Sequence, residues 1–451
     1  MTIFIPIFQG VEVKNILRTD IYKNLIKQPN VRIVLFIGTK DKADHYGREF
    51  FHERVHYEVV LNQPQTLWDK LMGFLKFKLI KTQTIDLRRK MALEDSGGYL
   101  AYASSWILNR LLARRWLRKF ARWVDYKMIG HSPFGNFFDQ YQPDVVFLAH
   151  LFDDLEIKML WEAKRRGIRT VGFINSWDKL TARGMIRLLP GTLLVFNDLV
   201  KQEAVDYADM NLENIEVVGI PQYDRYSAPQ LSSRDDFYNR IKIEAQKRVI
   251  VYAPMGKYFS NSDWDIIDLL RSYQNKKLIP HDVEILVRFQ PNDFIDEAEL
   301  KKRPWLVYDY PGIRFSDKRG VDWDMSFTDL QHLVDTLYYS SIFICYATSL
   351  SIDAAVFDRP VININFEVKE KQRLSQTPTH FYRTEHYSKA GRTGGIRFVN
   401  SEPEFLEWIN QYLAQPNLDH QGRKRLINEQ CWKLDGQSAY RVTKHIFSCI
   451  D

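Results

Sequence analysis

The sequence predicts an α/β protein made of two facing, doubly wound domains. Its 451 residues are more than a single ordinary hydrophobic core organises. Short apolar runs, typical of strands buried on both faces of a parallel sheet, alternate with helical patterns along the chain. A polar connection from Ser227 to Asp236 separates two such series. We therefore expect domains at residues 1–226 and 237–451, with an interdomain cleft where the carboxyl edges of the two sheets meet.

The first domain is predicted from a series of apolar runs interrupted by one long helical insertion. The insertion covers about residues 67–130, where the apolar spacing becomes helical. No GxGxxG follows the first run, whose turn contains only Gly10, so the dinucleotide-binding fingerprint is absent. The expected strands are residues 3–8, 31–37, 144–149, 170–174, 192–196 and 215–218.

The second domain is predicted from a similar alternation that begins after the polar connection. One unit in it combines a strand, a turn, a short helix and a second strand over residues 341–366. Such a crossover joins parallel neighbours, so its turn lies at the carboxyl end of a strand and at the amino end of a helix. Free backbone N–H groups there favour an anion, and we expect a nucleotide phosphate. The expected strands are residues 249–253, 283–289, 305–308, 342–345 and 361–364.

Composition and charge restrict the class of protein. The chain is 45% hydrophobic and 26% charged, as in globular proteins. A net charge of +7 favours an anionic partner, which could be a nucleotide, a nucleic acid or a membrane surface. The three cysteines have no metal-like spacing and support neither a disulfide framework nor a zinc site. The N-terminus lacks a basic secretory leader and no apolar run approaches the ~18 residues of a membrane span, so we expect a cytoplasmic protein.

The helical insertion contains a strongly basic and aromatic segment between Arg110 and Lys127. Such a helix could lie in an anionic membrane interface on the inner face of the cell membrane, with rings among headgroups and cations on phosphates. The alternative is an ordinary amphipathic helix with a solvated basic face. The cations are Arg110, Arg114, Arg115, Arg118, Lys119, Arg122 and Lys127, and they alternate with Trp106, Leu111, Trp116, Phe120 and Trp123.

A series of motifs from residue 144 onward resembles the GT-B glycosyltransferase superfamily. Within it, the chain is similar to bacterial nucleotide-sugar glycosyltransferases and to the CDP-glycerol glycerophosphotransferase branch. In order, the motifs are DVVFLA (144–149), NSWDKLTARG (175–184), VVGIPQYD (217–224), VYAPMGKY (251–258), VRFQPND (287–293), SLSIDAAVFDRPVINI (349–364) and DGQSAYRV (435–442).

The resemblance implies two facing Rossmann-like domains, an acceptor-side N-terminal domain and a donor-nucleotide C-terminal domain, with a final helix that crosses back to the first. It implies transfer of a sugar from a nucleotide-sugar donor to a lipid-linked or growing surface-glycan acceptor, with no cofactor and no metal. Ser349, Ser351 and Asp353 fall where the family holds the donor's phosphates and ribose. The E-x7-E signature of many retaining members is missing, which favours inversion.

Inverting transfer needs a base for the acceptor hydroxyl and positive charge for the departing nucleoside phosphate. Asp178 is the preferred candidate for the base, and its alternative role is an N-cap or Asx turn. Asp153 and Asp154 are the other candidates for this role.

Three cations of the second domain are candidates for phosphate binding. Lys257 follows a Pro and a Gly in a turn, although it could simply be a solvated surface side chain. Arg288 could bind phosphate through two N–H groups or pair with a carboxylate instead. His386 precedes a glycine-rich stretch that suggests a mobile loop, with an ordinary surface loop as the alternative.

Three alternative functions remain at this point. A CDP-glycerol-type polyol-phosphate transferase would share the fold, but that family carries a His-Gly pair where this chain has Ser176-Trp177-Asp178. A non-hydrolysing sugar-nucleotide epimerase would make no obvious use of the basic aromatic helix. A nucleic-acid-binding protein would use that helix, but the sequence has no zinc-finger spacing and no RNP-like motif, so we expect no nucleic-acid partner.

Overall fold

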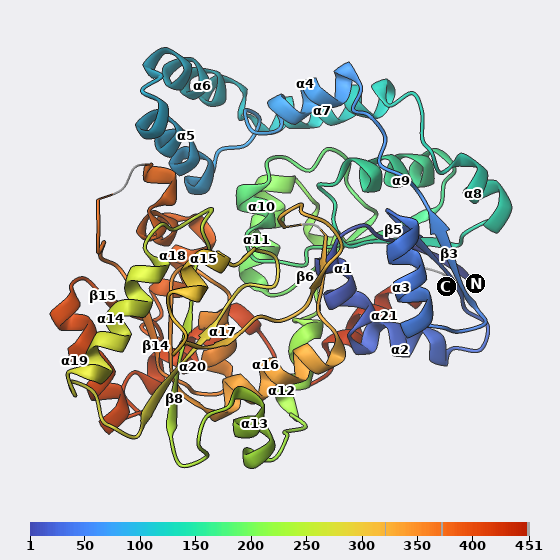
Figure 1. Cartoon of the computed structure of the whole chain (residues 1–451). Coiled ribbons are helices and arrows are strands. Elements are labelled where there is room, and N and C mark those ends of the chain that lie inside the picture. The colour runs from blue at the N-terminus through green and yellow to red at the C-terminus, as the bar shows by residue number, and fades with distance from the viewer. Residues whose placement is uncertain (321, 371–372, 449–451) are drawn as a thin grey trace. The chain divides into compact units, whose positions relative to one another are not determined.

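The computed structural model describes residues 1–320, 322–370 and 373–448. The chain divides into two compact units (Figure 1). Unit 1 comprises Met1–Arg89, Gly98–Ser227 and Cys431–Asp451, and unit 2 comprises Lys90–Gly97 and Ala228–Gln430. Among the described residues, no helix has the length and apolar character needed to cross a bilayer.

Unit 1 contains a seven-stranded parallel sheet in the order β3-β2-β1-β4-β5-β6-β7. Its inner strands are continuously buried, which explains why they could be predicted as apolar runs. The edge strand β3 was not predicted, because its residues are mostly half-buried and include His56 and Glu58. The strands are β1 Thr2–Ile7, β2 Arg32–Ile37, β3 Val55–Val59, β4 Val145–Leu148, β5 Arg169–Phe173, β6 Thr192–Val195 and β7 Ile215–Val217.

Helices cover both faces of this sheet (Figure 1). The sheet-covering and connecting helices are α1 Gly10–Glu12, α2 Asp20–Lys27, α3 Lys40–Glu49, α8 Gly135–Tyr141, α9 Asp154–Arg165, α10 Lys179–Ala182, α11 Asp198–Ala208 and α12 Asp224–Ser227, with a π-helix at Val13–Leu17 and 3-10 turns at Leu212–Asn214 and Pro221–Tyr223. The predicted helical insertion consists of α4 Leu67–Leu75, α5 Gln83–Ser96, α6 Tyr99–Leu112 and α7 Arg115–Met128. The segment expected as one basic helix is thus two, because the chain leaves the helical conformation at Ala113 and Arg114.

The chain returns to unit 1 at its end through α21 (Ser438–Ser448), which packs against α2. The Asp224 carboxylate accepts hydrogen bonds from the first backbone N–H groups of α21, Ser438 N at 3.0 Å and Ala439 N at 2.7 Å. An acidic side chain is favourable at the positive end of a helix. The PQYD and DGQS motifs therefore meet in a structural cap.

Unit 2 contains a six-stranded parallel sheet in the order β10-β9-β8-β13-β14-β15, and a separate hairpin, β11–β12. Its core includes the buried Ile250, Tyr252, Ile344 and Ile362 from the central strands. The last strand, β15, was not predicted. The strands are β8 Arg248–Ala253, β9 Val283–Arg288, β10 Val307–Asp309, β11 Ile313–Arg314, β12 Trp323–Asp324, β13 Ser340–Cys345, β14 Val361–Ile364 and β15 Arg397–Val399. The helices are α13 Arg234–Ile241, α14 Asp263–Asn275, α15 Glu297–Lys301, α16 Phe327–Tyr339, α17 Leu350–Val356, α18 Glu385–Gly391, α19 Glu402–Ala414 and α20 His420–Cys431, with 3-10 turns at Leu374–Gln376 and Pro378–Arg383.

A buried arginine joins the insertion to the body of unit 1. The guanidinium of Arg187, whose side chain is 2% exposed, donates two hydrogen bonds of 2.9 Å to the carboxylate of Asp125 on α7. It also bonds Asp69 on α4 at 3.1 Å and Asp154 on α9 at 3.2 Å. Trp68 Nε1 donates to Asp125 at 2.8 Å. The position of α4 and α7 therefore depends on one desolvated cation.

A second buried ion cluster holds α7 against the residue that follows α11. Arg118 and Arg122 are both buried and donate to the carboxylate of Asp209 at 2.6–2.8 Å. Both side chains are buried against one shared carboxylate, so these two residues do not belong to an exposed basic face.

Replacing Arg187 by alanine should strongly destabilise unit 1. The change leaves Asp69 and Asp125 buried without their main counter-charge, and breaking a buried ion pair in this way costs about 3–5 kcal/mol. Urea unfolding followed by circular dichroism would measure the loss. Arg169→Ala, at an exposed position of β5, is the matched control; equal stability of the two variants would contradict the role of Arg187.

Candidate functional site

The carboxyl edge of the unit 2 sheet has a topological switch point between β8 and β13. From β8 the chain builds β9 and β10 on one side and then returns to place β13 on the other. Ligands of doubly wound sheets bind outside the carboxyl ends of the strands at such a point. The loop after β8 contains Lys257, and the turn after β13 contains Ser349.

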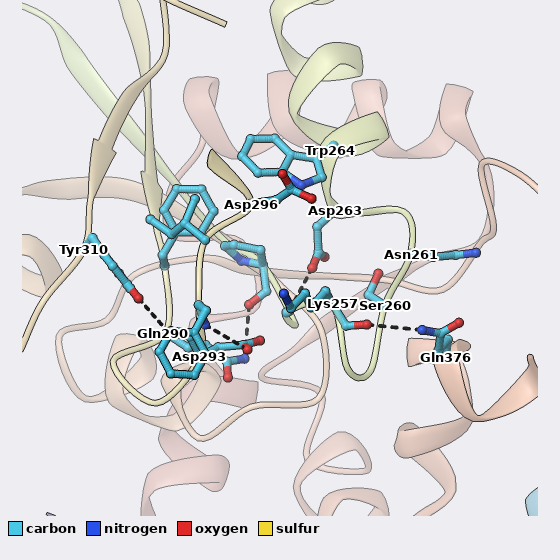
Figure 2. Close-up of a pocket in the computed structure, with 15 residues that line it drawn as sticks. Lys257, Ser260, Asn261, Asp263, Trp264, Gln290, Asp293, Asp296, Tyr310 and Gln376 are labelled. Carbon is cyan, nitrogen blue, oxygen red and sulfur yellow. Dashed lines mark hydrogen bonds between the residues drawn. The ribbon is translucent and has the colours of Figure 1, made fainter. Parts of the chain in front are cut away.

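A pocket of about 300 Å³ lies at this edge, between the loops that follow β8 and β9 (Figure 2). We call it the β8–β9 pocket. Aromatic side chains, amides and carboxylates all contribute to its walls. Its lining includes Gly256, Lys257, Ser260, Asn261, Asp263, Trp264, Phe289, Gln290, Asp293, Asp296, Tyr310 and Gln376.

Asp263, in the first turn of α14, fixes the shape of the β8 loop. Its carboxylate accepts hydrogen bonds from the backbone N–H of Met255 at 3.1 Å and of Gly256 at 2.8 Å, and from the Tyr252 hydroxyl at 3.0 Å. Burial raises the pKa of Asp263, although these hydrogen bonds act in the opposite direction. Gly256 has φ +87°, and a Cβ there would lie 2.0 Å from Asp293 Oδ2, so only glycine allows this close approach.

Hydrogen bonds join the two loops that form the pocket. Gln290 Nε2 donates to the carbonyl oxygens of Pro254 at 3.2 Å and Met255 at 2.8 Å. The Tyr310 hydroxyl donates to the carbonyl oxygen of Asp293 at 2.7 Å (Figure 2). The pocket is therefore a built cavity with a fixed set of donors and acceptors.

The lining favours a flat, hydrogen-bonding group over a highly charged anion. Trp264, Phe289 and Tyr310 offer aromatic surface, whereas the Asp263 carboxylate would repel phosphate oxygens. Asp293 is already paired with Arg319 at 3.1 Å. A nucleobase with its ribose has the matching chemistry.

Lys257 is the exposed cation of the β8 loop. Its side chain reaches solvent beside the pocket, and its carbonyl oxygen accepts a hydrogen bond from Gln376 Nε2 at 3.2 Å. Within the part of the chain that the structure describes, no acidic partner of the Lys257 ammonium is found. This cation can therefore serve an incoming anion.

Arg288, at the end of β9, has a different environment. It is 4% exposed and forms an ion pair with Asp309, whose carboxylate also lies 3.2 Å from Nε2 of His332. Burial, with the nearby charge of Arg288, lowers the pKa of His332 to about 4, so this imidazole is neutral at pH 7. The predicted phosphate contact of Arg288 competes with an ion pair already present.

The turn after β13 separates its two predicted serines. Ser349 is exposed at the N-cap of α17 and its hydroxyl makes no capping hydrogen bond. Ser351 is fully buried, and its hydroxyl lies 2.8 Å from the Tyr387 hydroxyl and 3.3 Å from Asn363 Oδ1. Asp353 is also buried, inside α17. Ser349 is thus the accessible hydroxyl, while Ser351 holds the turn in place.

His386 lies in the first turn of α18 and is half-buried. The expectation of a mobile loop at this position is wrong, because Glu385–Gly391 is helical. The chain leaves the helix only at Arg392, ahead of Gly394 with φ +72°.

The carboxyl edge of the unit 1 sheet has its own switch point, between β1 and β4. Asp178 follows β5 and accepts a hydrogen bond of 2.5 Å from the Ser176 hydroxyl. Asp153 follows β4, caps α9 through Leu155 N at 2.9 Å, and has a pKa raised by burial. Asp154 is paired with Arg187, which leaves it the least available of the three candidate bases.

Further ionisable residues at this edge are buried, and the sequence analysis did not identify them. Glu12, after β1, accepts hydrogen bonds from Phe8 N at 2.6 Å and Gln9 N at 2.9 Å. Burial raises the pKa of Glu12 to about 8, and the nearby Asp153 adds to this effect. Burial, with the charge of Glu12, also raises the pKa of Glu156. Glu12, Asp153 and Glu156 therefore form a carboxyl cluster in which burial raises every pKa.

Basic groups complete this environment. Lys179 is buried in α10, and desolvation lowers its pKa although Asp178, Glu12 and Glu156 stabilise its charge. His150 is buried after β4, and its pKa lies well below its usual range because of desolvation and the neighbouring Lys179. Strongly shifted groups at a strand edge are typical of functional sites.

Several buried polar atoms beside this cluster have no hydrogen-bond partner among the described residues. An ordinary structural core satisfies nearly all such atoms, so their concentration here indicates a place for water or a polar ligand. They are Glu12 Oε1, Asn15 Oδ1, His150 Nδ1, Glu156 Oε1, Asn175 Oδ1 and Asn175 Nδ2.

Comparisons with known proteins place the fold. No protein-family model matches the sequence, and no curated protein matches it. A UDP-GlcNAc 2-epimerase from Neisseria meningitidis bound to UDP-GlcNAc superposes with a TM-score of 0.56 at 10% identity, covering 99% of this chain and 100% of that one. A glycosyltransferase from Rickettsia africae superposes with a TM-score of 0.50 at 11% identity, covering 99% of this chain and 98% of that one. The wall teichoic acid polymerase TagF, solved with CDPG, gives 0.50 at 14% identity over 100% and 88%.

These neighbours share the GT-B fold, and the present chain has it too. The predictions of two parallel-sheet α/β domains and of a GT-B likeness are confirmed. At such low sequence identity, the likeness concerns the fold and leaves the activity to be argued from the residues.

Glu12→Gln should make the thermal stability of the protein less sensitive to alkaline pH. Folded Glu12 keeps its proton up to about pH 8, whereas the unfolded carboxyl loses it near 4.5. Stability from the neutral carboxyl is therefore complete below about pH 4.5 and is lost as pH rises through 8. Melting temperatures of wild type and variant at pH 5 to 9 should diverge towards pH 9, in favour of the variant. Glu213→Gln, at an exposed position, should follow wild type; parallel curves for Glu12→Gln would refute the buried proton.

Proposed function

We propose that the protein is a glycosyltransferase that moves a sugar from a nucleotide-sugar donor to a lipid-linked or growing surface-glycan acceptor. The β8–β9 pocket, beside the exposed Lys257 at the switch point of a GT-B sheet, is the observation on which this proposal rests. The neighbours solved with UDP-GlcNAc and CDPG support a nucleotide-linked substrate.

In this proposal unit 2 binds the donor in two parts. The base and ribose enter the β8–β9 pocket, where Trp264, Phe289 and Tyr310 supply aromatic surface and Gln290 and Asp293 supply polar atoms. The phosphates stay outside the acidic pocket, near the Lys257 ammonium and the Ser349 hydroxyl. Arg288 and His386 are further candidates for contacts with the phosphates, and Arg288 would exchange its ion pair with Asp309 for such a contact.

Unit 1 supplies the base. The acceptor oxygen attacks the anomeric carbon, the bond from that carbon to the nucleotide phosphate breaks with its electron pair, and a carboxylate takes the hydroxyl proton. Asp178 is the preferred carboxylate. Asp153 is the alternative, and its raised pKa brings it closer to the pH at which proton transfer is efficient. This single displacement inverts the configuration at the anomeric carbon, and positive charge on the protein stabilises the leaving group in place of a metal.

An epimerase is the second candidate function. UDP-GlcNAc 2-epimerases recur among the structural neighbours, and the carboxyl cluster of Glu12 and Glu156 offers groups able to exchange protons near neutral pH. A polyol-phosphate transferase is third, supported by the likeness to TagF. An epimerase would convert its nucleotide sugar without any acceptor, which separates it from both transferases.

A panel of UDP, GDP, CDP and CMP should contain at least one ligand that raises the melting temperature. Saturating nucleotide stabilises only the folded state, and 100-fold excess over Kd adds about 2.7 kcal/mol. Lys257→Ala should weaken the diphosphate about tenfold by removing a charge-assisted contact, and should leave the corresponding nucleoside unaffected. Lys424→Ala, another exposed lysine of unit 2, should behave as wild type. Flat curves for the whole panel would refute the nucleotide site.

Asp178→Asn should abolish sugar transfer while leaving nucleotide affinity nearly unchanged. Loss of a general base typically slows the reaction by about 10² to 10⁴. The measurement is release of nucleoside diphosphate from a nucleotide sugar that carries the base selected by the panel, with a lipid extract as acceptor. Asp153→Asn is the matched comparison, because asparagine keeps the capping oxygen of α9. Loss of activity in Asp153→Asn alone would move the base to Asp153, and full activity in both would exclude them.

A further inference from the structure

The helices α4 and α7 each expose an apolar stripe. On α4 the stripe consists of Leu67, Leu71 and Phe74, which are 85%, 44% and 55% exposed. On α7 it consists of Trp116, Phe120 and Trp123, which are 68%, 56% and 60% exposed. Both sets repeat at i, i+4 and i+7, so each forms one continuous line along its helix. We call the two stripes together the α4–α7 face.

The α4–α7 face is not needed for the core of the insertion. The opposite sides of the two helices already pack around the buried Met72, Leu79 and Met185, with Trp68 and Leu117 among the side chains against them. The helices lie side by side in Figure 1, in agreement with this cluster. Monomeric proteins rarely leave large rings exposed in a continuous patch, so this surface indicates a partner.

The charges around the α4–α7 face have one sign. The only carboxylates of α4 and α7, Asp69 and Asp125, are buried on Arg187. Arg118 and Arg122 are buried on Asp209. The exposed charged side chains of α4, α7 and the two-residue link between α6 and α7 are therefore all cations: Lys70, Arg114, Arg115, Lys119 and Lys127. Of these, Arg115 also lies 3.6 Å from the Asp209 carboxylate.

Helix α6 exposes further apolar side chains of the insertion. The buried Asn109 donates to the carbonyl oxygens of Lys78 at 3.0 Å and Ile80 at 2.8 Å, which fixes α6 to the segment after α4. Near this anchor α6 exposes Ile107 and Leu111, which are 51% and 61% exposed.

We propose that the α4–α7 face docks onto a bilayer rich in anionic lipid. The aromatic and leucine side chains enter the interface between headgroups and acyl chains, and the surrounding cations meet lipid phosphates. The structure refines the single basic helix expected from the sequence. The apolar stripes of two helices enter the bilayer, and the buried Arg118 and Arg122 do not contact lipid. This inference is independent of the proposed sugar transfer.

Other partners fit this surface less well. A second copy related by a two-fold axis would bring cations against cations, with no exposed carboxylate on either helix to pair with them. Single-stranded nucleic acid would stack on the rings, but Leu67 and Leu71 offer it no stacking surface.

Vesicle sedimentation of the full-length protein tests the proposal. Wild type should bind vesicles of phosphatidylcholine mixed with phosphatidylglycerol, bind phosphatidylcholine alone far more weakly, and release with added salt. The variant W116S/F120S/W123S should bind more than about a hundredfold more weakly, because three rings lose their burial. R115Q/K119Q should lower the affinity for the anionic vesicles about tenfold and leave binding to phosphatidylcholine vesicles unchanged.

Two further variants keep the result interpretable. L67S/L71S/F74S should reproduce the loss from the neighbouring helix, so a folding defect in one variant does not decide the outcome. F51S/L212S removes exposed apolar side chains elsewhere in unit 1 and should bind as wild type. Absence of binding by wild type, or equal binding by all variants, would overturn the proposal. So would a wild-type dimer that the α7 variant converts to a monomer without any lipid binding, since the face would then be a subunit interface.

Discussion

The buried cation of Arg187 is the interaction on which the organisation of unit 1 depends. Its guanidinium forms ion pairs with carboxylates of α4, α7 and α9, elements that lie far apart in the sequence. Three carboxylates that contact one guanidinium tolerate little displacement, because each buried charge has lost its hydration and must be compensated by its ion-pair partner. The same residue thus fixes the α4–α7 face and engages Asp154 at the start of α9. Asp153, directly before Asp154, belongs to the carboxyl cluster. Arg187 therefore positions both the α4–α7 face and the helix that begins beside this cluster.

The two carboxyl edges offer different chemistry. In unit 2 the edge holds a preformed pocket with aromatic and acidic walls and an exposed lysine beside it, which suits recognition of a nucleoside next to an anion. In unit 1 the edge buries several acids with Lys179 and His150, and burial keeps Glu12 protonated at neutral pH. The two edges thus present different side chains by the same physical means, the convergence of loops where parallel strands end.

The fold is preserved where sequence similarity has nearly vanished. Identities of 9–14% to GT-B structures accompany coverage of almost the whole chain. Burial of parallel strands constrains apolar character and length and leaves residue identity free, so such a fold persists through extensive substitution. The chemistry follows from the few polar residues at strand ends, which such a comparison does not determine.

The sequence by itself determined the alternation of strands and helices, the division near Ser227 and the polar turns at strand ends. These features are encoded locally, by runs of apolar residues and by the spacing of polar ones. It placed Lys257, Ser349 and Asp178 after the correct strands. It could not separate the exposed Ser349 from the buried Ser351, or show that Arg288 faces Asp309. Nor could it indicate Glu12 and Glu156, since an acid in a first helical turn is usually a solvated one. Only the tertiary structure decided which charges are buried together, because desolvation depends on neighbours that are distant in the chain.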